Sequence, residues 1–387
     1  MPLPITYNVR SLRVRWKSTL LAIVGISLVV AVFVGLLSMS SGFRLALRAT
    51  GSPQNGIVLQ KGSQSELSSS FSKAASDWVA VDPRIARDSN GKPLASPELV
   101  TVVALPKRTD GELSNVTVRG VTPAVFSVRN ETTLLQGRHA RPGLFEIIVG
   151  KQVQDRIRGL DVGSSISIMK RDFEVVGVFA ADGSSFESEI WGDLDAMASA
   201  FNRSGTENSL TARLVDPATL PEFNRELEAN PQYQLQMEQE QRYYEDQAGP
   251  LSKFLRSLAA FVSLVMGIGA VFGAMNTMYA IVAARTREVG TLRTLGFSRS
   301  TILFSFVLEG LFLAIVGGVL GCLLSLLMDG VNTATTANMG EIAFAFRVTS
   351  LDFVCGLFFA VTMGIAGSLL PAFRAATMPI TAALRDL

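Results

Sequence analysis

Between two long uncharged runs of this chain lies the stretch Arg285-Thr-Arg-Glu-Val-Gly-Thr-Leu-Arg-Thr-Leu-Gly-Phe-Ser298. Val289, Leu292 and Leu295 recur within it at a spacing that puts them in one apolar stripe of a helix. Gly296 is placed to end such a helix in a left-handed cap, and Ser298 is placed to cap the start of the next helix. The pattern predicts a short basic helix that faces a cytoplasmic partner. A lipid-binding hairpin is the alternative interpretation.

Four segments are long and apolar enough to cross a bilayer, because about 20 apolar residues suffice for a spanning helix. A charge at the centre of a span costs roughly 2.5–3.5 kcal/mol on insertion scales. Residues 18–43, 257–284 and 353–373 carry no charge, and 300–328 carries only Glu309. We place the spans at 18–43, 253–284, 300–328 and 351–373.

Basic residues flank these spans on one side, and Lys and Arg are retained on the cytoplasmic side of a membrane. They are Arg10, Arg13, Arg15, Lys17, Arg285, Arg287, Arg293, Arg299, Arg374 and Arg385. We therefore predict both termini and the loop 285–299 inside, with 44–252 and the short loop 329–350 outside. The expected fold is a membrane protein with four transmembrane α-helices and a large extracytoplasmic α+β domain inserted between the first and the second.

Residues 1–17 are predicted to form a cytoplasmic amphipathic helix, because Ile5, Val9, Leu12 and Trp16 fall on one face. A charged flank that only sets topology is the alternative. A cleaved signal peptide is disfavoured, since the apolar run exceeds the roughly 7–15-residue core of such peptides and no A-x-A site follows. Residues 374–387 are expected to form a cytoplasmic tail.

The external segment 44–252 has α+β character. Strand-like runs occur at 98–105, 114–121, 145–149, 164–169, 173–179 and 209–215, and helix-like runs at 151–158, 194–201 and 221–228. The stretch 51–97 is richer in Ser, Gly and Pro, which predicts long loops or a less regular subdomain. Pro250 is expected to kink or restart the helix that enters the second span.

Composition argues against several classes of function. The chain has 48% hydrophobic and 18% charged residues and a net charge of +2. The Lys and Arg residues at the cytoplasmic ends of the predicted spans account for this slight positive charge, so it does not indicate a nucleic acid partner. Cys322 and Cys355 both fall inside spans, which leaves the external domain without a disulfide. His139 is the single histidine, which argues against a histidine-based metal site or catalytic triad.

No enzyme site is recognisable either. Glu187 and Glu189 are interpreted as solvated carboxylates, because no base or metal-ligand partner accompanies them. The G-x-x-x-x-G-K-[ST] phosphate loop is absent from the sequence, and the nearest stretch, Gly56 to Gly62, has Lys61 before the glycine. We expect no catalytic, cofactor-binding or metal residues, and ATP bound only by a separate partner subunit.

At both ends and in part of the middle, the chain resembles the FtsX/MacB-type ABC transporter permeases. The motifs are Arg287-Glu288-Val289-Gly290, Leu292-Arg293-Thr294-Leu295-Gly296, Val307-Leu-Glu-Gly310, Gly317-Gly-Val-Leu-Gly321, Pro371-Ala-Phe-Arg-Ala-Ala376 and Pro379-Ile-Thr-Ala-Ala-Leu384. Residues 150–178 resemble the membrane-proximal part of the family's external domain. The region 51–130 matches less clearly, which is where the choice of substrate or partner is expected to reside.

The resemblance implies a non-catalytic permease subunit in a bacterial cytoplasmic (inner) membrane. Two such chains, identical or different, would pair with a dimer of cytoplasmic ABC ATPases, and a periplasmic adaptor or membrane fusion protein would bind outside. Residues 286–296 would be the coupling helix that docks on the ATPase, with Arg287, Glu288, Val289, Gly290, Leu292, Arg293, Leu295 and Gly296 as its coupling residues. ATPase movements would then drive the external domain to export or extract a substrate, a mode called mechanotransmission.

Two other functions remain open. One is an FtsX-like transmembrane signal relay that regulates a cell-wall hydrolase without transport, and the other is a membrane sensor without an ATPase.

Small and charged residues inside the spans are further candidates. The pairs Gly269 with Gly273 and Gly317 with Gly321 have the G-x-x-x-G spacing that permits close helix approach, either within the chain or between two chains. Glu309 is a candidate for a functional intramembrane group. Its alternative is a structural role at the elbow after the short helix, paired with a neighbouring Arg.

Overall fold

The computed structural model describes residues 16–337 and 340–379. It falls into two compact units. The helical unit comprises the described parts of residues 1–42, 252–331 and 346–387, and the sheet unit comprises residues 43–251 and 332–345. The expected N-terminal amphipathic helix lies almost wholly outside the described residues, as do the last eight residues of the expected tail.

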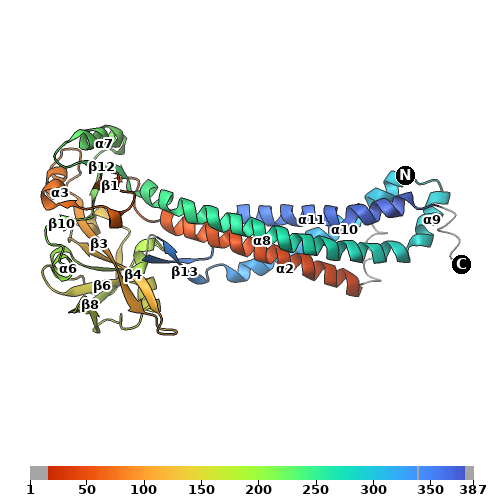
Figure 1. The fold of residues 1–387 in the computed structure, drawn as a ribbon, viewed down its shortest axis with the longest axis horizontal. Coiled ribbons are helices and arrows are strands. Elements are labelled where there is room, and N and C mark those ends of the chain that lie inside the picture. Colours follow the sequence, from red (N-terminus) through yellow and green to blue (C-terminus); the bar gives the residue numbers. More distant parts are fainter. Residues whose placement is uncertain (1–15, 338–339, 380–387) are drawn as a thin grey trace. The chain divides into compact units, whose positions relative to one another are not determined.

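Among the described residues, four helices are long and apolar enough to cross a membrane. These are α2 (Trp16–Arg48), α8 (Glu240–Ala284), α10 (Arg299–Ser325, continued by the 3-10 turn Leu326–Met328) and α11 (Ser350–Thr377). Each contains one of the segments expected to span the membrane. The short helix α9 (Thr286–Thr294) lies between the end of α8 and the start of α10 (Figure 1).

Glycines let the helices of the helical unit approach closely. A Cβ on Gly310 of α10 would lie 2.5 Å from Ser368 Cβ of α11, and a Cβ on Gly321 would lie 2.6 Å from the carbonyl oxygen of Ser27 on α2. Small residues at helix contacts are typical of membrane bundles, where packing rather than the hydrophobic effect holds helices together. The bundle core therefore depends on the absence of side chains at these positions.

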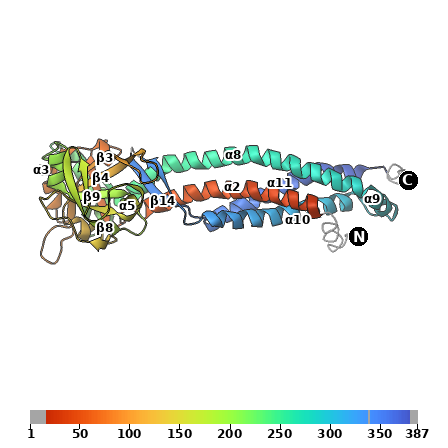
Figure 2. The same ribbon diagram turned by 90° about the horizontal axis from the view of Figure 1, so that it is seen from below.

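Helix α8 continues through Pro250 without a break. The expectation that this proline would restart the helix is therefore wrong. Proline removes one backbone hydrogen bond from a helix but does not interrupt the remaining ones. As a result α8 is assigned as a single helix from Glu240 to Ala284 (Figure 2). Its residues 240–251 belong to the sheet unit and its residues 252–284 to the helical unit.

The sheet unit is built on a ten-stranded mixed sheet with the order β12-β1-β11-β3-β4-β9-β6-β8-β5, and β7 pairs with β8. Its strands are β1 (Asn55–Gln60), β3 (Ala95–Pro106), β4 (Leu113–Val121), β5 (Thr133–Gly137), β6 (Glu146–Gly150), β7 (Ser165–Ile168), β8 (Arg171–Ala180), β9 (Glu189–Asp193), β11 (Ser209–Arg213) and β12 (Leu235–Gln239). A small separate pair is formed by β2 (Phe71–Ser72) and β10 (Thr206–Glu207). All six strands expected from the sequence are present.

The helices of this unit are α3 (Lys73–Ala80), α4 (Val125–Val128), α5 (Lys151–Arg156), α6 (Leu194–Ala200) and α7 (Leu220–Ala229). The three helices expected from the sequence correspond to α5, α6 and α7. Short 3-10 turns occupy Glu66–Ser68, Ser185–Ser188 and Pro217–Thr219.

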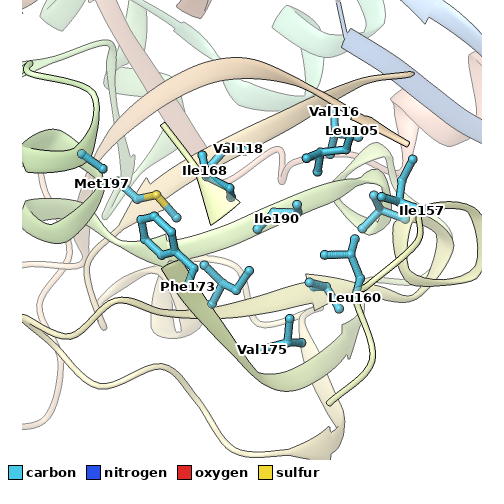
Figure 3. Packing of buried hydrophobic residues seen from close by; sticks show 14 of the residues in the cluster. Leu105, Val116, Val118, Ile157, Leu160, Ile168, Phe173, Val175, Ile190 and Met197 are labelled. Atoms are coloured by element: carbon cyan, nitrogen blue, oxygen red, sulfur yellow. The ribbon is translucent and has the colours of Figure 1, made fainter. Parts of the chain in front are cut away.

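Two hydrophobic cores hold the sheet unit together. The first gathers apolar side chains from β4, β6, β7, β8 and β9, including Val118, Ile190 and Phe173, with Met197 of α6 packed among them (Figure 3). The second gathers Val58 of β1, Leu210 of β11, Val79 of α3 and Phe223 of α7. The stretch 51–97, expected to be irregular, thus contributes β1, α3 and part of β3 to a regular core.

A β-hairpin stands where a short loop was expected between the third and fourth spans. It consists of β13 (Asn332–Ala337) and β14 (Gly340–Ala345), and it belongs to the sheet unit. Phe344 is buried against Phe43 with ring centroids 5.4 Å apart, and the Ala343 amide donates to Ser188 Oγ at 2.9 Å. Glu341 forms ion pairs with Arg156 and Lys107.

Candidate functional site

Helix α9 is delimited by capping interactions at its C-terminus. Gly296 has a φ of +91°, its amide donates to the Arg293 carbonyl, and the Phe297 amide donates to the Leu292 carbonyl at 3.1 Å. This pair of bonds is the Schellman motif, which satisfies the last carbonyls of a helix. The left-handed cap expected at Gly296 is confirmed.

The next helix begins two residues later. Ser298 Oγ accepts a hydrogen bond from the Thr301 amide at 3.2 Å, so the predicted cap of α10 is confirmed as well. The chain therefore turns from α9 into α10 through two adjacent caps, which define the position of α9 with little loop between the helices.

One face of α9 is fastened to the helical unit. Val289 and Gly290 are buried, and Val289 packs in a cluster with Met278 and Val282 of α8 and Ile302 and Phe306 of α10. The expected apolar stripe is divided by this packing. Leu292 is half-buried, whereas Leu295 has 71% of its surface exposed.

A buried ion pair fixes the elbow between α8 and α9. Arg285 Nη1 donates to Glu309 Oε2 of α10 at 3.0 Å, and Arg285 Nε donates to Glu288 Oε2 of α9 at 3.0 Å. Glu309 and Arg285 are both buried, and the guanidinium also lies 5.4 Å from the centroid of the Phe306 ring. Removing one partner of a buried pair typically costs about 3–5 kcal/mol, because the other charge stays buried. Glu309 thus contacts the residue just before α9.

The outer face of α9 is open. Arg287, Glu288, Thr291, Thr294 and Leu295 are exposed along it. The cavity beneath the helix, lined by Arg285, Val289 and their neighbours, measures about 10 Å³, which is room for roughly one water molecule. The surface of α9 that a partner can contact is therefore its outer face. There the exposed apolar side chain of Leu295 lies beside charged and hydroxyl groups.

The two glycine pairs occupy different environments. Gly317 and Gly321 pack against α2, where a Cβ on Gly317 would lie 3.0 Å from Ile26 Cβ. Gly269 and Gly273 are exposed on α8, with nothing within 4 Å of a Cβ placed on either. The first pair thus serves packing within the chain, and the second lies on an open helix surface.

A second cluster of charges, missed by the sequence reasoning, lies buried inside the sheet unit. Arg119 of β4 forms ion pairs with Glu66, Glu98 of β3 and Glu189 of β9, at 2.6, 2.6 and 2.8 Å. Glu187 and Glu189 are both buried, so their interpretation as solvated carboxylates is wrong. Glu189 also accepts from the indole of Trp191 at 2.7 Å.

This ionic cluster continues to the first residue of α8. Arg129, which follows α4, forms ion pairs with Glu98 at 2.7 Å and with Glu240 at 2.9 Å, and all three side chains are fully buried. Glu240 Oε2 accepts from the Ser52 amide at 3.0 Å and from Asn55 Nδ2 at 2.9 Å. The start of α8 is thereby bonded to the beginning of β1 and to the residue that follows α4.

Burial and charge act in opposite directions on these carboxyls. Burial raises the pKa of Glu98 above its usual value, although Arg129 and Arg119 oppose the rise. Burial also disfavours ionisation of Glu66, yet the charge and hydrogen bonds of Arg119 outweigh it and lower the pKa of Glu66. The pKa of the Arg119 guanidinium is raised despite its burial by the surrounding glutamates, so the cluster keeps its arginines charged.

No group of three or more His, Cys, Asp or Glu side chains suited to a metal ion occurs within residues 16–337 and 340–379. Cys322 in α10 and Cys355 in α11 are free cysteines, because neither forms a disulfide. The features that stand out are therefore α9 with its elbow and the ionic cluster at the start of α8.

Comparison with known proteins decides the family. Residues 19–230 match the MacB-like periplasmic core domain, and residues 260–380 match the FtsX-like permease C-terminal domain. The chain belongs to the MacB/FtsX-type ABC transporter permeases. It is thus a membrane-embedded permease of the ABC transporter type, and the family resemblance found in the sequence is confirmed.

Two relatives of this MacB/FtsX-type permease differ in how much of their length it matches. The pyoverdine export ATP-binding/permease protein PvdT of Pseudomonas fluorescens (strain Pf0-1) is 30% identical over 265 residues, which are 62% of this chain but 38% of PvdT. The uncharacterized ABC transporter permease YknZ of Bacillus subtilis (strain 168) is 24% identical over 381 residues, which are 94% of this chain and 92% of YknZ. The permease therefore spans well under half of PvdT and nearly all of YknZ.

The crystal structure of the periplasmic region of MacB from Actinobacillus actinomycetemcomitans covers 52% of this permease and 94% of its own chain, with a TM-score of 0.39 and 11% identity.

Proposed function

We propose that this permease transmits the conformational change of a cytoplasmic ATPase to an extracytoplasmic domain, the sheet unit, and so drives export or extraction of a substrate. The observation that carries the proposal is the construction of α9. It is capped at its end, packed along one face and open along the other. A partner that pushes on the open face moves the ends of α8 and α10 with it, because Val289 and the Arg285–Glu309 pair join α9 to both helices.

In this proposal α2, α8, α10 and α11 cross a bacterial cytoplasmic membrane, with both termini and α9 inside and the sheet unit outside. The support is their length and hydropathy together with the four arginines at positions 285, 287, 293 and 299, since basic residues are retained on the cytoplasmic side. The sheet unit takes its residues from the two segments expected to lie outside.

Helix α8 supplies the mechanical link. It is continuous from Glu240, bonded in the ionic cluster, to Ala284, one residue before the elbow arginine. An α-helix is stiffened by hydrogen bonds between successive turns, of which Pro250 removes one in α8. Displacement of its cytoplasmic end is then transmitted to the strands that hold Glu240, without a substrate having to pass between the helices.

The partners follow from the family and from the open surfaces. We propose a pair of ABC ATPase subunits under α9, a second permease chain, identical or different, and a periplasmic adaptor or membrane fusion protein on the sheet unit. The open Gly269 and Gly273 face of α8 is our proposed contact with the second chain, because small residues there allow close helix approach. The names of PvdT and MacB specify different exported compounds, pyoverdine and macrolides. They therefore support export as the function, but they do not indicate which substrate this permease would export.

The test compares the unmodified permease with the Leu295→Asp variant in two assays. The first measures whether the ATPase co-purifies with the permease, and the second measures how strongly the reconstituted permease stimulates ATP hydrolysis. Because Leu295 is 71% exposed and outside the packed face, the change leaves the permease fold intact. Burying a leucine at an interface contributes roughly 1.5–3 kcal/mol, so we expect at least a tenfold loss of stimulation. Leu292→Pro would break α9 itself and is less informative.

Leu113→Asp is the matched control, since Leu113 is 70% exposed on β4 of the sheet unit. It should leave ATPase capture and stimulation unchanged. Full stimulation by the Leu295→Asp variant, or no ATPase recovered with the unmodified permease, would overturn the assignment of α9.

A further inference from the structure

A cavity of about 140 Å³ opens on the sheet unit where β4 and β9 end beside the first half of β6, which runs antiparallel to β9. Its floor is apolar, formed by Val121, Ile148 and the fully buried Trp191. Phe126 forms one wall, and its ring packs against the imidazole of His139 with centroids 4.1 Å apart. Apolar cavities of roughly 150 Å³ hold one benzene ring, so this cavity is the size of a single six-membered ring.

Prolines shape the rim of the cavity. Pro123 follows β4 and Pro142 lies in the segment between β5 and β6, and both line the opening. Proline fixes its own φ near −65°, which restricts the backbone at the entrance. A site with stiff walls loses little conformational entropy when it is filled, which favours a small ligand.

The cavity has two polar groups that a ligand could satisfy. Asp193 lines it, and while Oδ2 of this residue accepts from the Ala196 amide at 3.1 Å, its other oxygen forms no hydrogen bond in the described structure. The hydroxyl oxygen of Thr122, also in the lining, is buried without a hydrogen-bond partner. Buried polar atoms in native proteins are rarely unpaired, which applies to Thr122 Oγ1, whereas the Asp193 side chain is half-buried. Small-molecule sites typically combine apolar walls with a few polar groups.

Charge selects among ring-shaped ligands. Asp193 has the single formal charge among the lining side chains, because the other lining residues are apolar, hydroxyl-bearing or a histidine. A carboxylate at an apolar pocket favours a ligand with a hydrogen-bond donor, above all a protonated amine, and disfavours an anion.

We propose that this cavity is a binding site for a small alkylamine that carries an aromatic ring, with the ring against Trp191 and Phe126 and the protonated amine at Asp193. The site goes beyond the proposed coupling function, since its lining includes no residue of α9 and neither of the arginines of the ionic cluster, Arg119 and Arg129. It would give the sheet unit direct contact with a small molecule on its own side of the membrane.

Trp191 provides a built-in reporter for the test. The chain has three tryptophans, so Trp16→Phe with Trp78→Phe leaves Trp191 as the sole tryptophan of the full-length permease in lipid nanodiscs, and it can be excited selectively over the tyrosines. Benzylamine is the probe, and benzyl alcohol is its neutral counterpart of nearly the same shape. We expect saturable quenching by both, with benzylamine binding about fivefold more tightly.

Two variants separate specific binding from partition into lipid. Asp193→Asn keeps the helix cap, because Asn and Asp cap equally well, and should remove the fivefold preference for the amine. Ala140→Phe places a ring at the cavity wall and should abolish the response to both probes. If Ala140→Phe misfolds, as judged by a shift of the Trp191 emission maximum, Ala140→Leu replaces it as the filling variant, because it adds no fluorophore.

Quenching that does not saturate, or that persists unchanged in the filled cavity, would overturn the proposal. An amine preference unaffected by Asp193→Asn would overturn the role of the carboxylate. None of these outcomes bears on ATPase stimulation, so the site and the coupling function can fail independently.

Discussion

Replacing Glu240 by glutamine is expected to loosen the start of α8 from the sheet unit. Every group that contacts this carboxylate is a donor: Arg129 Nε, the Ser52 amide and Asn55 Nδ2. The amide of glutamine has nearly the same shape, but its NH2 group would face donors instead of accepting from them. The hydrogen bonds to whichever oxygen the NH2 group replaces would be lost, and Arg129 would lose one of its two carboxylate partners.

The size of the effect follows from burial. Glu240 and Arg129 are fully buried, and removing one partner of such a pair costs about 3–5 kcal/mol. For a domain of 150–250 residues, each kcal/mol shifts the melting temperature by roughly 2–4 °C. The melting temperature of the sheet unit should therefore fall by about 6–20 °C.

The assay is thermal unfolding of the full-length permease in nanodiscs, followed by the fluorescence of Trp191, which contacts the same cluster through Glu189. Glu245→Gln is the control on the same helix. Glu245 pairs with Arg48 at 3.0 Å, but the two side chains are 42% and 70% exposed. Exposed pairs contribute about 0–1 kcal/mol, so this variant should shift the melting temperature by no more than about 4 °C. Equal shifts for the two variants would refute the reasoning.

Two further predictions concern helix packing and pH. Gly321→Ala puts a methyl group 2.6 Å from the Ser27 carbonyl oxygen, so overpacking should destabilise the helical unit by about 1–3 kcal/mol, whereas Gly269→Ala has open space and should leave its thermal stability unchanged; equal destabilisation would contradict this packing. Arg138 lowers the pKa of Glu146 from 4.5 to about 2 by hydrogen bonding. Since ionised Glu146 is favoured in the folded state, its stabilisation is present above pH 4.5 and is lost as pH falls towards about 2. Melting curves of Arg138→Gln should therefore lose part of this pH dependence, and curves parallel to the wild type would argue against the pair.

The elements that could be predicted from the sequence were those set by local chemistry. Gly296 and Ser298 define the ends of α9 and α10 through bonds within four residues, so their types alone indicate the caps. The long apolar runs likewise predict α2, α8, α10 and α11, because hydropathy over twenty residues depends on no distant contact.

The ionic cluster could not be predicted in the same way. Glu66, Glu98, Arg119, Glu189 and Glu240 are far apart in sequence, and only the tertiary fold of the sheet unit brings them together. A signal was nevertheless present, since Arg119 interrupts the strand-like run 114–121 and Glu98 begins the run 98–105, and a charge in a buried strand is costly unless paired. The hairpin at 332–345 was missed for a different reason, because the sequence of β13, Asn-Thr-Ala-Thr-Thr-Ala, is made of small and polar residues and lacks the alternation of apolar and polar residues that indicates a strand.

The hairpin β13–β14 has a consequence for how the protein is made. The sheet unit needs Phe344, Ala343 and Glu341, which contact Phe43, Ser188 and Arg156, yet the ribosome adds them only after the whole of α10. At about 5–20 residues per second, the rest of the sheet unit waits several seconds with that surface uncovered. Its folding cannot finish before three of the four long helices have been synthesised, so membrane insertion and completion of this unit are coupled in time. A version ending at residue 251 would stay in the unfinished state, with Phe43 and Ser188 exposed.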